Sequence, residues 1–240
     1  MFPLKDNIPT RDLPVVTIAL IAINVLVYFL WQKGGLSLGD PSGGHYRRQL
    51  LDYALRPCEL DGRCAASGPA EALTPFTAMF MHGGLLHLGG NMLFLWIFGN
   101  NVEDAMGRGR FVVFYLVGGL AADALQIATD LGTNVPTIGA SGAVAAVLGG
   151  YLLLYPRAKV VTLVFIIFLF TILELPALLF LVIWFGQQLL FGAAGLTSGG
   201  DGGGVAYFAH IGGFAFGLLT IKLFATRRNA MADQRRVPVA

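Results

Sequence analysis

The chain has 240 residues, of which 55% are hydrophobic and 12% charged, and 32 are glycine. This composition lies outside the range of ordinary soluble domains and within that of helical membrane proteins. The formal net charge of +2 says little about partners. Because no motif supports a nucleotide, haem or nucleic-acid site, we expect no cofactor and no nucleic-acid partner.

Six segments are apolar and long enough to be read as membrane-spanning helices. A helix needs about 20 mostly apolar residues to cross a hydrocarbon core of roughly 30 Å. The segments are 15–31, 84–98, 111–129, 141–155, 175–191 and 207–226. The sequence therefore predicts an all-α, polytopic membrane protein with a bundle of six transmembrane helices.

The positions of the 16 Lys and Arg residues favour cytoplasmic termini. With six spans and the N-terminus inside, eleven of them fall on the cytoplasmic side, where such residues accumulate. The other five lie in the long outer first loop, 32–81, and long loops translocate largely regardless of charge. We expect a cytoplasmic N-terminal tail (1–14), a membrane domain (15–226) and a basic cytoplasmic tail (227–240).

The apolar run 160–191 is longer than one span requires, and Glu174 and Pro176 interrupt it. Either residues 160–171 form an extended or helical lead-in at the inner interface, or the run contains two short spans. Two spans would place the basic C-terminal tail outside, so the charge pattern favours a single span.

Two features of the outer loops remain open. Cys58 and Cys64 lie in the first loop, where an oxidising compartment would allow a disulfide, and the sequence does not decide whether it forms. Without histidines at ligand spacing they do not indicate a zinc site. The segment SGGDGGG, 198–204, predicts either a mobile loop or a plain connector before the last span.

Four polar side chains near span ends are functional candidates, because such groups are costly inside a membrane. His87 and Asn91 are four residues apart and share one helix face. They could reach a common point or could form interhelical hydrogen bonds. We expect His82 at the membrane interface, and no His-Glu-x-x-His pattern supports a catalytic zinc.

The other two candidates are Ser141 and His210. Ser141 lies in the segment GASG, 139–142, at a helix start, where free N–H groups would favour an oxyanion; a plain N-cap is the alternative. His210 precedes Gly213 and Gly217, a small-xxx-small pattern that permits close helix packing. The fourth span offers two matching rows, Ser141/Ala145/Gly149 and Gly142/Ala146/Gly150.

The predicted topology places the four candidates at one depth. The second, fourth and sixth spans all run from the outer face inward, and each candidate lies near the beginning of its span. The four side chains are therefore expected a few to about ten ångströms below the outer surface.

In these segments the sequence resembles the rhomboid family of intramembrane serine proteases. The resemblance rests on HGGLLHLGGNMLFLWIFGNNVED at 82–104, GASG at 139–142 and AHIGGFAFG at 209–217. It implies Ser141 as nucleophile and His210 as general base, with oxyanion stabilisation by His87, Asn91 and the Ser141 N–H. Motif and packing roles fall to Gly139, Gly142, Gly213 and Gly217.

The resemblance also implies partners and location. Substrates are expected to be single-pass transmembrane proteins cut in or near their spans, with the fifth span as the lateral entrance and the Gly-rich loop as a lid. We expect an integral, multi-pass protein of a bacterial plasma membrane, in contact with the lipid bilayer. The oligomeric state stays open.

Two departures from the family pattern leave alternatives in view. Many members have an aromatic ring four residues after the nucleophile, where this chain has Ala145, and a Trp-Arg pair where it has Leu73 and Thr74. A catalytically inactive, rhomboid-like scaffold that binds transmembrane clients is therefore the alternative. A transporter is disfavoured, because the polar residues cluster near one face and no repeat is visible.

Overall fold

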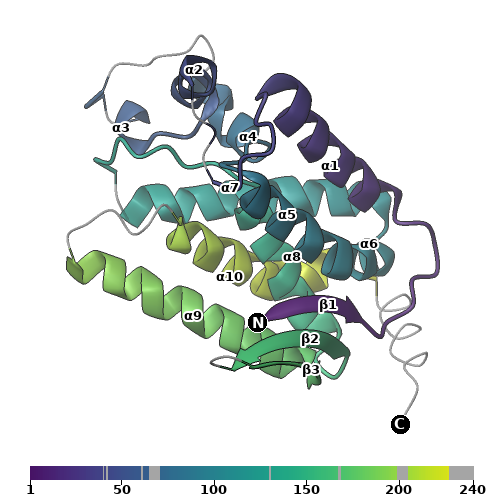
Figure 1. The fold of residues 1–240 in the computed structure, drawn as a ribbon. Helices are drawn as coiled ribbons and strands as arrows, with labels where there is room; N and C mark the ends of the chain where they lie inside the picture. The colour runs from purple at the N-terminus through teal and green to yellow at the C-terminus, as the bar shows by residue number, and fades with distance from the viewer. Residues whose placement is uncertain are drawn as a thin grey trace.

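A computed structural model describes residues 1–39, 41, 43–60, 62–64, 71–129, 131–166, 169–198 and 205–226. The chain is mostly helical, with about two thirds of its residues in helices and a small sheet at one side (Figure 1). The predicted basic tail, 227–240, lies outside the described residues. The predicted lid, 198–204, also lies outside the described residues, apart from Ser198, which ends a helix.

The six predicted spans each correspond to a helical segment. They are α1 (Val15–Leu26) with the π-helical turn η1 (Val27–Trp31), α5 (Leu85–Phe94) with the π-helical turn η3 (Leu95–Gly99), α7 (Arg108–Thr129), α8 (Ser141–Leu154), α9 (Ala177–Ser198) and α10 (Tyr207–Phe224). The first loop contains α2 (Gly44–Tyr53), α3 (Pro57–Leu60), the 3-10 turn η2 (Glu71–Leu73) and α4 (Thr74–Ala78), and α6 (Asn100–Met106) follows η3.

Three helices are by themselves long and apolar enough to cross a membrane: α7, the Ala177–Leu196 part of α9, and α10. The stretch Val15–Trp31 and α8 are apolar but shorter. The chain therefore carries the apolar helices of a membrane protein, and by length and composition three helices among the described residues could each span a bilayer.

Helix α8 is the centre of the bundle, because it is built almost entirely from small and aliphatic residues. All of its residues except Ser141 and Leu153 are buried. It packs against α10, α7, η3 and α9 (Figure 1). Both predicted rows meet α10. Ala145 and Gly149 of the first row lie against Gly213 and Phe214, and the carbonyls of Gly142 and Ala146 of the second row lie against Gly213 and Gly217.

The contacts along α8 fix the direction of its neighbours. Toward α10, Gly142 meets Gly213 and Ala146 meets Gly217, so these helices run parallel. Gly139 lies beside His87, and Phe98 packs on Tyr151 with ring centroids 4.9 Å apart, so α5 with η3 also runs parallel to α8. The starts of α5, α8 and α10 therefore lie at one end of the bundle, here called the loop end.

The opposite end, here called the sheet end, contains a feature that the all-α prediction missed. Strands β1 (Phe2–Asp6), β2 (Lys159–Ile166) and β3 (Leu169–Pro176) form an antiparallel sheet in the order β1-β2-β3, beside α9 (Figure 1). The chain is mostly helical, as predicted, but it is not all-α, because residues 2–6 of the predicted N-terminal tail pair with β2. The lead-in to α9 is extended, because β-branched residues favour strands and β1 supplies a pairing partner.

Two polar clusters hold the sheet end together. The Glu103 carboxylate accepts hydrogen bonds from the Val16 and Thr17 N–H groups at 3.0 and 2.8 Å, and so caps α1, which follows Pro14 and has no side-chain cap of its own. Asp6 accepts hydrogen bonds from the Asn101 amide and the Tyr151 hydroxyl, both at 2.6 Å. Burial raises the pKa of the Asp6 carboxyl from 3.8 to about 6.

The close packing of α8 and α10 predicts a strong penalty for a side chain at Gly217. A Cβ there would collide with the Ala146 carbonyl oxygen. We expect Gly217→Ala to destabilise the protein by about 1–3 kcal/mol through overpacking, as measured by reversible unfolding in mixed micelles. Gly186→Ala is the matched control, because nothing lies within 4 Å of a Cβ at Gly186. Equal stabilities for the two variants would contradict the packing.

The buried Asp6 carboxyl predicts a pH-dependent stability. Since its folded-state pKa of about 6 lies above the ordinary 3.8, the folded state holds the proton more tightly. The resulting stabilisation is full below pH 3.8 and is lost as pH rises through about 6. The thermal midpoint of the wild type should therefore fall relative to that of Asp6→Asn as pH rises from 4 to 7. Parallel curves for the two proteins would show that Asp6 does not titrate as described.

Candidate active site

Ser141 is the first residue of α8, at the loop end. The preceding residues bring it there through a sharp turn. Gly139 has a φ of +121°, a conformation that favours glycine, and its N–H donates to the Ala78 carbonyl at 2.9 Å. Ser141 is half-buried, and the first N–H groups of α8 have no partner within the helix.

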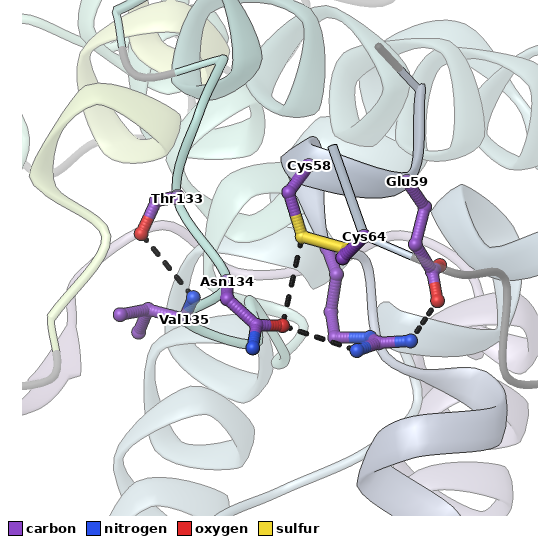
Figure 2. The surroundings of a disulfide bond; sticks show 7 residues. Cys58, Glu59, Cys64, Thr133, Asn134 and Val135 are labelled. Carbon is purple, nitrogen blue, oxygen red and sulfur yellow. Dashed lines mark hydrogen bonds and ion pairs between the residues drawn. A yellow bond between two sulfur atoms is a disulfide. The ribbon is translucent and has the colours of Figure 1, made fainter. Parts of the chain in front are cut away.

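Hydrogen bonds and side-chain contacts join the first loop to residues 133–137, which lead to Ser141 (Figure 2). Leu55 and Thr137 exchange backbone hydrogen bonds at 3.1 and 2.8 Å, and the Cys58 N–H donates to the Thr133 carbonyl at 3.0 Å. Cys58 and Cys64 form a disulfide, which answers the question that the sequence left open. The Cys58 sulfur lies 3.5 Å from Asn134 Oδ1. Figure 2 draws this contact as a dashed line. This loop is therefore anchored without the Trp-Arg pair.

Arg56 joins the same anchor. Its guanidinium donates to Asn134 Oδ1 at 3.0 Å and forms an ion pair with Glu59. Both side chains of this pair are about 4% exposed. A buried guanidinium is tolerated here because a carboxylate and an amide oxygen both accept from it.

His87 and Asn91 lie on α5 beside the turn before Ser141. The Gly83 N–H donates to His87 Nδ1 at 3.3 Å, so Nδ1 is an acceptor and Nε2 carries the proton. A Cβ on Gly139 would lie 2.6 Å from this Nε2 and 3.6 Å from the Asn91 amide nitrogen. Glycine at 139 therefore lets two N–H donors approach the backbone next to Ser141.

The Asn91 amide group is also a donor that the fold leaves unused. Asn91 is 8% exposed, and its Nδ2 has no hydrogen-bond partner among the described residues. A buried donor without a partner costs free energy, and a bound group that supplies an acceptor would remove this cost.

His210 lies one turn into α10, where that helix meets the start of α8. A Cβ on Gly142 would lie 3.9 Å from the Ala209 Cβ, and one on Gly213 would collide with the Gly142 carbonyl. Gly142 and Ala209 thus meet where α8 contacts α10. Ser141 is next to Gly142 in the chain, and His210 is next to Ala209. Among the residues that the structure describes, no hydrogen bond joins the two side chains. Such bonds are often long before substrate binds.

The side chain that holds His210 was missed in the sequence. His210 Nδ1 lies 2.8 Å from Gln188 Oε1, and the Trp184 ring packs on the imidazole with centroids 5.9 Å apart. Both residues lie on α9, not on α8, where Ala145 leaves no ring. The signal was present, because Gln188 is a polar residue within a predicted span.

His82, which we expected at the membrane interface, also contacts the candidate site. Its side chain is fully buried within the protein, and its ring packs edge-on against His87 with centroids 5.1 Å apart. Its backbone is fixed by Gln32, whose side chain donates to the His82 carbonyl at 3.2 Å and accepts from its N–H at 2.9 Å. His82 therefore packs against the ring of His87 and restricts its orientation.

Comparison with known proteins supports one family. The model of the rhomboid domain matches residues 69–227. The chain is 28% identical to Rhomboid protein 1, mitochondrial, of Saccharomyces cerevisiae over 84% of this chain and 51% of that protein. It is 32% identical to Rhomboid protease GluP of Bacillus subtilis over 58% of this chain and 24% of that protein.

A third relative is the human Presenilin-associated rhomboid-like protein, mitochondrial, which is 27% identical over 63% of this chain and 36% of that protein. The chain thus spans about half the length of these relatives or less. The rhomboid model nevertheless covers about two thirds of the chain, and it includes all four candidate side chains. The chain belongs to the rhomboid family.

Proposed function

We propose that this chain is an intramembrane serine endopeptidase that hydrolyses peptide bonds in or near the transmembrane segments of membrane proteins. The observation that carries the proposal is the meeting of three helix starts at the loop end. There Ser141 and His210 lie next to the residues through which α8 and α10 touch. The Asn91 amide nitrogen, a donor without a hydrogen-bond partner among the described residues, lies beside the turn before Ser141. The similarity to a relative named as a protease supports it.

In the proposed reaction the Ser141 hydroxyl attacks the scissile carbonyl carbon. His210 accepts the hydroxyl proton as the new C–O bond forms and then donates it to the leaving amine as the C–N bond breaks. A water molecule, deprotonated by the same imidazole, hydrolyses the acyl-enzyme and restores the serine. The histidine needs no carboxylate partner for this role if packing orients it.

The negative charge on the substrate oxygen would be met by three donors. They are the Ser141 backbone N–H at the start of α8, the protonated Nε2 of His87 and the Asn91 amide. Each donor directed at a developing oxyanion contributes on the order of 3 kcal/mol to the reduction of the barrier. The unsatisfied Asn91 group supports this assignment, because the reaction would supply its missing acceptor.

The proposal includes six spans with both termini in the cytoplasm of a bacterial plasma membrane. Helix α9 starts beside Ala158 at the sheet end and reaches His210 at the loop end, as a full crossing requires. The Cys58–Cys64 disulfide supports an outward-facing loop end, because disulfides persist in oxidising compartments. The active site would then lie near the outer face.

Substrates would be single-pass membrane proteins that reach Ser141 from the bilayer. We assign the lateral entrance to α9, which is largely exposed along one side of the bundle (Figure 1). The segment to be cut must unwind, because a helix hides its carbonyl groups from a nucleophile. Small or helix-breaking residues near the substrate's cleavage site would favour this unwinding.

Cleavage in reconstituted liposomes tests the proposal. With a fluorescent transmembrane substrate panel, we expect the wild type and Ser37→Ala to cleave, and Ser141→Ala and His210→Ala to lose at least about a thousandfold in rate. Ser37 is a loop-end serine outside the candidate site. Cleavage by Ser141→Ala would refute the nucleophile. A folded wild type that cuts nothing but still binds the substrates would favour the inactive scaffold.

A further inference from the structure

The dyad of the proposed function needs a histidine whose ring is held in one orientation and one tautomer. Ala145 on α8 is fully buried and provides no aromatic ring for this purpose. The contacts of the imidazole are instead made by α9 and by Tyr207 of α10. These contacts determine which nitrogen of His210 carries the proton.

A chain of two hydrogen bonds fixes the orientation of the Gln188 amide. Gln188 Nε2 donates to the Trp184 carbonyl at 3.2 Å. Since a backbone carbonyl can only accept, the amide nitrogen must face Trp184, and Oε1 must face His210. The orientation of the amide therefore follows from the chemistry of its neighbours.

The tautomer of His210 follows in the same way. Gln188 Oε1 lies 2.8 Å from His210 Nδ1, and an amide oxygen can only accept. Nδ1 must then carry the proton. In the neutral imidazole this leaves Nε2 with its lone pair, which is the form that a general base requires.

The environment of the bond favours its persistence. Gln188 is 8% exposed, whereas the side chain of the neighbouring Gln187 is exposed. Trp184 and Gln188 are four residues apart and so share one helix face. The Trp184 ring lies at 33° to the imidazole, and Tyr207 meets it at 84° from another side, with centroids 6.5 Å apart. A hydrogen bond shielded in this way is stronger than one in water.

We infer that Gln188 is a positioning residue for His210, which it holds as the Nδ1–H tautomer while Trp184 packs on the ring. The inference rests on the proposed function, because it assigns His210 the role of base. It also gives α9 a second role. The helix assigned as the lateral entrance carries the group that orients the base, so a displacement of α9 would release the imidazole.

Three variants in the liposome assay separate this role from a structural one. Gln188→Met keeps the size of the side chain but removes the acceptor, and we expect kcat to fall about tenfold with KM unchanged, as for the loss of one buried hydrogen bond. Gln188→Glu keeps an acceptor oxygen and should restore most of the rate. Gln187→Met, the same change on the exposed face, should match the wild type. Wild-type kcat in Gln188→Met would overturn the inference.

A second measurement does not depend on cleavage. With ¹⁵N-labelled histidine, the ring signals of His210 are identified by their loss in His210→Ala. We expect the Nδ1–H tautomer in the wild type and in Gln187→Met, and a large population of the Nε2–H tautomer in Gln188→Met. An unchanged tautomer would overturn the role of Gln188 even if the proteins cleave. Cleavage by Ser141→Ala would instead overturn the proposed function.

Discussion

The direct backbone contact between α8 and α10 is the constraint on which the candidate site depends. Gly213 and Gly217 carry no side chains that would keep the helices apart, so carbonyl oxygens of α8 lie against α10. Because the helices are this close, the start of α8, which carries Ser141, lies beside the start of α10, which carries His210. A bilayer provides no hydrophobic force between helices, so close van der Waals packing must hold such a contact.

Other parts of the fold act on the two residues from opposite sides. The first loop, which contains the Cys58–Cys64 disulfide, is hydrogen-bonded to the segment that leads to Ser141. On the other side α9 contacts His210 through Gln188 and Trp184. The Gln126 side chain accepts from the Ala209 N–H at 3.1 Å and so caps α10 just before His210. Ser141 and His210 are thus held by separate elements.

Much of this arrangement could be predicted from the sequence, because it depends on strong local signals. Apolar runs located the six helical segments, and the spacing of Gly213 and Gly217 predicted the α8–α10 contact. Polar residues in apolar segments indicated His87, Asn91, Ser141 and His210. The structure confirms that His87 and Asn91 lie together and that the helix starts of Ser141 and His210 adjoin, while their roles stay proposals.

The remaining features depend on contacts between distant parts of the chain. Strands β2 and β3 lie in a continuous apolar run, which does not distinguish a strand from a helix. The other partner of β2, strand β1, lies more than 150 residues away in sequence. His82 packs on His87 although the two residues are five apart in sequence, a spacing that does not place them on one helix face. Gln188 was visible as a polar residue in a span, but only the fold shows that it faces His210 and that Gln187 does not.

The most direct test of the account is covalent labelling of the nucleophile. A fluorophosphonate reacts with a serine only when a neighbouring base activates it, and mass spectrometry of the digested protein then identifies the modified residue. The account predicts a single adduct on Ser141 in the wild type and no adduct in His210→Ala. An adduct on another serine, or equal labelling of Ser141 without the histidine, would contradict the assignment of Ser141 and His210 as a catalytic dyad.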